Sequence, residues 1–151
     1  MTIEPSAETV IARLLPPDSE PRVLAVIWAT VDFDRVLAGI GLAAEALPDD
    51  RLLGAAVRLV RPPDGEPIAL LEPTTEGRIA ATLAQVGEGP AGQYVLATGG
   101  LSSIVVRAAA AGIGIKRADD GPFGPSILVL GGPPAGPHVV LVAAPAGTID
   151  R

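Results

Sequence analysis

The sequence contains no cysteine, which excludes disulfide bonds, thiolate metal sites and a cysteine nucleophile. Aromatic residues make up only 3% of the chain, so Ala, Val, Leu and Ile must fill most of the core. A broad aromatic platform for stacking is therefore excluded. There is one histidine, His138, and it is the only side chain with an unperturbed pKa near neutrality.

Positive charge is also scarce. The formal net charge is -6, and the Lys and Arg residues are scattered along the chain. A nucleic-acid binder needs a stripe of cations to neutralise phosphates, so DNA and RNA are discounted as partners. Apolar runs stay well short of the roughly 18 residues of a membrane span. Residues 1–22 combine acidic residues with prolines where a signal peptide would be basic. We therefore expect no membrane partner and a cytoplasmic location.

The chain has 151 residues, of which 48% are hydrophobic, as expected of one domain with ample material for a core. Residues 6–15 (SAETVIARLL) predict a short leading helix. The β-branched run 22–30 predicts a buried strand. Residues 32–47 open with acidic residues and continue with apolar positions three and four apart. They predict a helix, which Gly39 and Gly41 weaken and could end early.

Two strand-like runs, 53–61 and 67–72, surround a Pro-Pro-Asp-Gly turn and predict a hairpin. Residues 75–85 predict a connecting helix. The second half then repeats the first, with a strand at 94–98, a helix at 101–111, another proline-rich turn and a last strand that ends in proline. Because the later strands in each half follow through short turns, the repeat predicts mixed α+β modules rather than a doubly wound sheet.

Two segments resemble those of the vicinal oxygen chelate family, which includes glyoxalases, bleomycin-resistance proteins and methylmalonyl-CoA epimerases. LLEPTTEGRIAATLAQVGEGPAG (residues 70–92) resembles the linker between the family's two modules, and ATVDFDRVL (residues 29–37) resembles its first strand-to-helix junction. The resemblance implies two tandem βαβββ modules that form a cup-shaped mixed sheet. On that frame residues 1–151 form a single glyoxalase-like domain, with an N-terminal extension at 1–21, module one at 22–73, a linker helix at 74–89 and module two at 90–147.

In the family, a divalent ion sits in the cup on His, Gln and Glu side chains. The resemblance places these ligands at Ala25, Ala69 and Leu141 and near Gln93. The first three side chains cannot bind a metal, and one neutral amide is too little for a divalent ion. We therefore expect a divergent member that has lost its metal and uses no cofactor.

The remaining candidates are few. His138 is the candidate acid or base, although its place after a Gly-Pro turn also suits a surface imidazole. Gln93 is the candidate to hydrogen-bond a ligand oxygen, and Phe123 either covers the cup or lies in a plain turn. By strand alternation Trp28 and Tyr94 should face the helices. We expect the cup to be lined by Gln93, Ala25, Ile27, Ala69, Leu71, Val95, Leu141 and Phe123.

Three classes of function follow. The first is a metal-independent isomerase, lyase or cyclase that acts on a small, largely apolar organic molecule. The second is a binding protein that sequesters such a molecule or a drug, and the third is a partner-binding or vestigial module whose cup is filled by its own side chains. The small apolar interior favours the first class, and a homodimer is left open as the assembly.

Overall fold

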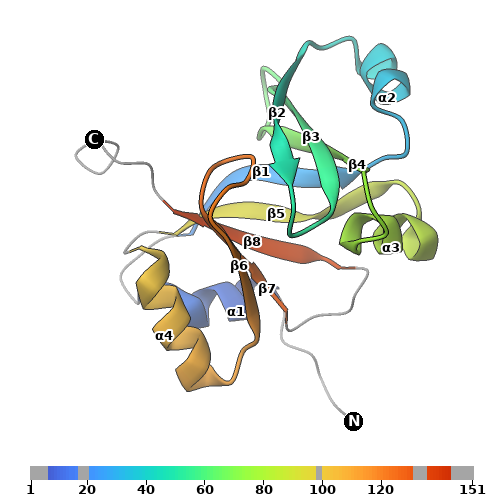
Figure 1. Ribbon diagram of the computed structural model, residues 1–151. Helices are drawn as coiled ribbons and strands as arrows, with labels where there is room; N and C mark the ends of the chain where they lie inside the picture. Colours follow the sequence, from blue (N-terminus) through green and yellow to red (C-terminus); the bar gives the residue numbers. More distant parts are fainter. Residues whose placement is uncertain (1–6, 17–20, 98–99, 131–135, 144–151) are drawn as a thin grey trace.

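One curled sheet organises the molecule (Figure 1). The computed structural model describes residues 7–16, 21–97, 100–130 and 136–143. In that part of the chain eight strands pair in the order β2-β3-β4-β1-β5-β8-β7-β6. The elements are α1 (Ala7–Leu14), β1 (Arg22–Ala29), α2 (Phe33–Ile40), β2 (Ala44–Asp50), β3 (Ala55–Val60), β4 (Ile68–Pro73), α3 (Arg78–Val86), β5 (Gly89–Ala97), α4 (Leu101–Ala111), β6 (Ile115–Ala118), β7 (Ser126–Val129) and β8 (His138–Ala143).

The strand pairing divides the sheet into two equivalent halves. Each half is a βαβββ module, the first running from β1 to β4 and the second from β5 to β8. Within each module the first and last strands are parallel neighbours, β1 with β4 and β5 with β8. The modules join where β1 and β5 pair antiparallel. The predicted α+β fold of two tandem modules, with a short leading helix, is therefore confirmed.

One predicted element was wrong. Residues 32–47 form a helix only as far as Ile40, and residues 44–50 are the edge strand β2. The helix stops because Gly41 adopts the left-handed conformation, with φ of 68°, and its N–H bonds the Leu37 carbonyl. The following Ala-rich segment has helix-forming residues, but its pairing with β3 overrides that preference.

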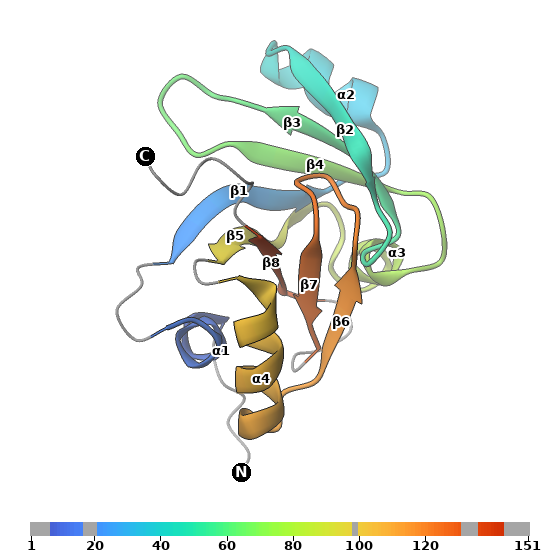
Figure 2. The ribbon, with the colours of Figure 1, turned by 60° about the vertical axis from the view of Figure 1, so that its left-hand side comes forward.

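The helices lie on the outside of the curled sheet and leave its inner face free of them, except where α3 covers one end (Figure 2). Buried residues on the inner face form what we call the inner cluster. Its members are Ala25, Ile27, Ala29, Leu52, Leu53, Ala55, Val57, Leu59, Ala69, Leu71, Ile79, Ala91, Tyr94, Leu128, Val140 and Val142. On the outer face, one cluster packs under α1 and α4 and another under α2.

Candidate functional site

Four of the predicted cup-lining residues lie together on the inner face. Ala25, Ile27, Ala69 and Leu71 belong to the inner cluster, and each is fully buried. Phe123, in the loop between β6 and β7, is partly buried against the same cluster. Phe123 thus lies in a turn that packs on the inner cluster, and a role as a lid stays a prediction.

Val95 and Leu141 lie on the opposite face. Both pack in the outer cluster with α1 and α4, and the inner position of β8 is taken instead by Val140. The placement of Leu141 as a ligand position in the cup is therefore corrected. Trp28 packs under α2, as strand alternation predicted.

The orientation of Tyr94 is a further correction, because it faces into the cup and not toward the helices. A β-bulge explains the change. Between Ile27 and Trp28 the β5 partner advances by two residues, from Gly92 to Pro90, so that Ala91 is an extra residue in β5. The bulge shifts the alternation of β5, and Tyr94 turns inward while Gln93 is left half-buried outside the inner cluster.

Tyr94 makes the polar contact that distinguishes the inner face. Its hydroxyl donates a hydrogen bond of 2.7 Å to Asp50 Oδ2, and the Leu53 N–H donates one of 2.8 Å to Asp50 Oδ1. Asp50 is only 2% exposed and Tyr94 is fully buried. Reasoning from the sequence missed this pair, because the predicted helix ended just before Asp50 and its partner lies 44 residues away.

Burial shifts the protonation of both groups. Desolvation raises the pKa of Asp50 above its usual range, even though the hydrogen bonds from Tyr94 and Leu53 oppose the shift. Desolvation and the neighbouring Asp50 carboxylate raise the pKa of Tyr94 well above 10. The pair is therefore a proton donor and a weakly basic carboxylate enclosed in an apolar surrounding, the kind of environment in which acid and base groups are tuned.

Two loops from different modules meet over Tyr94. The turn between β2 and β3, residues 50–54, reaches it through Asp50. The loop between β6 and β7, residues 119–125, reaches it through Phe123, whose ring packs edge-on against Tyr94 with centroids 4.9 Å apart. We call these loops the first flap and the second flap. Farther out, Arg51 and Asp120 form an ion pair of 3.5 Å between the two flaps, so both an inner and an outer contact hold them together.

A groove of about 520 Å³ lies where the flaps meet, and we call it the mouth groove. Its lining residues are Arg51, Leu52, Lys116, Arg117, Ala118, Asp119 and Asp120. Leu52 belongs to the inner cluster, and Ala118 packs against it. The floor of the mouth groove is thus continuous with the interior of the cup.

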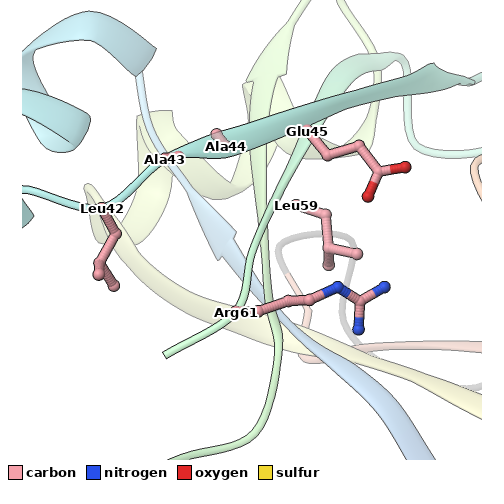
Figure 3. Close-up of a pocket in the computed structure, with 6 residues that line it drawn as sticks. All are labelled: Leu42, Ala43, Ala44, Glu45, Leu59 and Arg61. Carbon is pink, nitrogen blue, oxygen red and sulfur yellow. The ribbon is translucent and has the colours of Figure 1, made fainter. Parts of the chain in front are cut away.

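A second groove, of about 330 Å³, lies between β3 and the chain that leads from α2 into β2. Figure 3 shows Leu59 between the charged side chains of Glu45 and Arg61, with Leu42 at the other end of the groove. The two charges are opposite, so the groove has no net preference for an ion of either sign. It is the weaker candidate for a ligand site.

His138 packs against the connecting helix. Its Nε2 lies 3.0 Å from the hydroxyl of Thr82 in α3, and the side chain is 2% exposed. Burial, with a smaller contribution from the positive charge of Arg78, lowers the pKa of His138 to about 4, so the imidazole is neutral near pH 7. This contact links α3 to β8, and by strand alternation the His138 side chain faces the same side of the sheet as Val140 and Val142 of the inner cluster.

Two carboxylates, Glu72 in β4 and Glu88 in the linker, accept hydrogen bonds from backbone N–H groups of module one. Glu72 accepts a hydrogen bond of 2.9 Å from the Phe33 N–H, which anchors the start of α2. Glu88 accepts bonds from the Thr30 hydroxyl and the Val31 N–H, and it is ion-paired with Arg35. The bond from Arg35, together with the other two, lowers the pKa of Glu88 to about 2. The contacts of Glu88 join the linker to module one, and the contact of Glu72 holds α2 to β4 within module one.

The donor set on the inner face does not fit a divalent metal. The inward residues nearest the expected ligand positions are Ala25, Ala69, Tyr94 and Val140. Three of these have no donor atom, and the Tyr94 hydroxyl is already bonded to Asp50. Over the described part of the chain, no group of three or more His, Cys, Asp or Glu side chains could hold a metal ion.

The curled sheet, its module order and its helices define the fold of the vicinal oxygen chelate proteins. Methylmalonyl-CoA epimerase from Mycobacterium tuberculosis is 21% identical, with a TM-score of 0.67, over 89% of this chain and 96% of that one. A variant of the Streptomyces coelicolor epimerase, in complex with 2-nitronate-propionyl-CoA, is 20% identical over 85% of this chain and 100% of that one, also with a TM-score of 0.67. A hypothetical protein from Bacillus halodurans C-125 is 15% identical, with a TM-score of 0.66, over 86% of this chain and 99% of that one.

At these identities the likeness concerns the fold. Searches of protein-family models and of curated proteins find no match. None of the helices in residues 7–16, 21–97, 100–130 and 136–143 is long and apolar enough to cross a membrane. What this chain does must therefore be argued from the cup and its mouth.

Proposed function

We propose that the protein binds a small, largely apolar organic molecule in its cup without a metal and acts on it as an isomerase, lyase or cyclase. The observation that carries the proposal is the chemistry of the inner face. Small side chains such as Ala25, Ala29 and Ala69 surround one polar pair, Asp50 and Tyr94. An apolar site with few, well-placed polar groups is typical of small-molecule binding.

The polar pair offers what such chemistry requires. Isomerases, lyases and cyclases move a proton on an organic substrate, and a buried carboxyl with a raised pKa is suited to give or take one. Tyr94 can supply a hydrogen bond to an oxygen of the substrate when it releases Asp50. The epimerases that share the fold act on a thioester of coenzyme A, and acyl-CoA esters therefore belong among the molecules to be tested.

A second candidate, a module that has lost its ligand, is supported by the way its own side chains fill the cup. The side chains of the inner cluster are at most 9% exposed, and Phe123 covers Tyr94. A module that has lost its ligand would look like this. Binding in the cup requires Phe123, which is only partly buried, to move aside. A sequestering protein would need the same movement but no proton transfer.

A thermal-shift screen of acyl-CoA, polyketide and drug libraries tests the proposal. We expect hits that raise the melting temperature, and we expect Phe123→Ala, which vacates the space over Tyr94, to change their affinity. The matched control is Val106→Ala, a truncation on α4 of a side chain that is 69% exposed.

The results separate the classes. Hits that are converted to product support the enzyme, provided that Asp50→Asn and Tyr94→Phe lose turnover and keep binding. Hits without turnover support sequestration, and the absence of any hit supports the module that has lost its ligand. A cytoplasmic location and a homodimer remain predictions, to be checked by fractionation and by light scattering.

A further inference from the structure

The mouth groove opens to solvent at one end and onto the inner cluster at its floor. Leu52, which is 9% exposed, and Ala118 form an apolar floor shared with the inner cluster. The rim is polar and comes from the first flap, from β6 and from the second flap. A molecule in this groove would touch both modules and would have its apolar part directed at the inner face.

The rim carries an excess of positive charge, in contrast to the whole chain. The rim has three cations, Arg51, Lys116 and Arg117, and two carboxylates, Asp119 and Asp120. The chain as a whole has a net charge of -6. Asp120 is engaged by Arg51 at 3.5 Å. Within the described residues, Lys116 and Arg117 have no ion-pair partner at 4 Å or less.

We propose that the mouth groove binds the anionic head group of an amphipathic molecule, such as a medium-chain carboxylate, whose apolar tail enters the cup between Leu52 and Ala118. The inference rests on the proposed function, because the tail needs the cup. Charge complementarity selects the head, since two unpaired cations attract an anion and repel an ammonium group. The apolar floor selects the tail, since the tail covers the part of Ala118 that is exposed and meets the buried inner cluster through Leu52.

The ion pair between the flaps would respond to the ligand. Arg51 can exchange the carboxylate of Asp120 for that of the ligand at little cost, because both side chains are largely exposed, at 76% and 64%. The exchange removes the outer contact between the flaps. Phe123, on the second flap, can then leave Tyr94 and make room for the tail.

Three probes with one tail and different heads test the proposal: decanoate, decanol and decylammonium, each titrated calorimetrically below its aggregation concentration. We expect decanoate to bind about tenfold more tightly than decanol, and decylammonium to bind less tightly than decanol. The preference for decanoate should shrink as the salt concentration rises from about 0.02 M to about 0.5 M, because exposed charges are screened.

Charge variants locate the head group. The double variant Lys116→Gln, Arg117→Gln should lose most of the preference for decanoate and bind decanol unchanged. Asp120→Asn should bind decanoate more tightly, because it removes the competing carboxylate. The matched control is Arg22→Gln, which removes one exposed positive charge from the start of β1, outside the groove, and should leave all three affinities unchanged.

Two results would overturn the inference. If decanol binds and decanoate binds no more tightly, the cup takes apolar molecules and the anionic head is wrong. If the double variant and Arg22→Gln reduce decanoate binding equally, the effect is one of overall charge and not of the groove. A third result, binding of none of the three probes, would overturn the inference as well, whereas hits in the thermal-shift screen would leave the proposed function standing.

Discussion

The two modules share one order of elements but contribute differently to the cup. In module one the central strands turn Ala25 in β1 and Ala69 in β4 inward, with the larger Ile27 and Leu71 two residues further along. In module two the corresponding strands turn Tyr94 and Val140 inward. Module two therefore supplies bulk to the cup, while module one supplies Asp50, which holds that bulk in place.

The helices differ in a similar way. Helix α2 of module one has 8 residues and a side-chain cap, because Asp32 accepts bonds from the N–H groups of Asp34 and Arg35. Helix α4 of module two has 11 residues and begins after Gly100 without such a cap. A short helix relies on its end contacts, whereas α4 also packs on α1 and on the outer face of β8. The comparison indicates that module one depends more on polar contacts and module two more on packing.

The largest expected effect comes from removing the bulk of module two. Tyr94→Ala leaves a cavity in the inner cluster and should lower the free energy of unfolding by about 3–5 kcal/mol. Tyr94→Phe leaves Asp50 without its donor and should cost about 1–3 kcal/mol. Ala25→Gly, at the facing position in module one, should cost only about 1 kcal/mol. Urea unfolding measures all three, and equal losses for Tyr94→Ala and Ala25→Gly would contradict the asymmetry of the modules.

The stability contributed by the first residue of the last strand should depend on pH in module two and not in module one. His138 opens β8, where Ile68 opens β4. Because the pKa of His138 is lowered from 6.5 to about 4 in the folded protein, the unfolded chain binds the proton first. Stability from this group is thus complete above pH 6.5 and declines as the pH falls toward 4, by about 3 kcal/mol.

The measurement is the free energy of unfolding at several pH values, with His138→Gln as the comparison. The raised pKa of Asp50 acts in the opposite sense, since its protonated form is favoured in the folded state. The difference between the wild type and His138→Gln isolates the histidine. A difference that does not change between pH 7 and pH 4 would show that His138 titrates normally.

The side-chain cap of α2 provides a test of the difference between α2 and α4, since α4 begins without such a cap. Asp32→Ala removes the acceptor of two backbone N–H groups and should lower stability by about 1 kcal/mol. Ser102→Ala, in the exposed first turn of α4, should change it by less than about 0.5 kcal/mol. If the two variants unfold at the same urea concentration, the dependence of module one on this cap is refuted.

The smallest effect is expected where the modules touch at the surface. Arg51→Gln breaks an exposed ion pair and should change stability by less than about 0.5 kcal/mol. A melting temperature equal to that of the wild type agrees with this. A loss above about 1 kcal/mol would mean that the flaps are held together by Arg51 rather than by Tyr94.

Much of the fold could be predicted because it follows from local patterns. The alternation and turns of β3 and β4 gave a hairpin, and the repeat of strand and helix gave two modules. Strand β2 was missed because Ala44–Asp50 favours a helix until β3 is present to pair with it. The boundaries of 1–21, 22–73, 74–89 and 90–147 remain predictions, and residues 133–135 of the second proline-rich turn lie outside the described part.

The site was harder to predict because it depends on distant contacts. Ala25 and Ala69 were placed on the inner face by resemblance, and both belong to the inner cluster. Alternation fails in β5, where the bulge at Ala91 turns Tyr94 inward. The pairing of Tyr94 with Asp50 joins a central strand of one module to an edge turn of the other. Its position follows from the curl of the sheet, which no short stretch of sequence encodes.

In the described part of the chain the sheet is open, with β2 and β6 as its two border strands. Such borders invite strands of other molecules and so promote aggregation. Each border has a feature that discourages this: β2 contains Pro48, which lacks an N–H, and β6 is only 4 residues long and presents Lys116 and Arg117. The cations at the mouth groove thus also protect the chain from edge-to-edge association, and their removal should make concentrated protein less able to stay in solution.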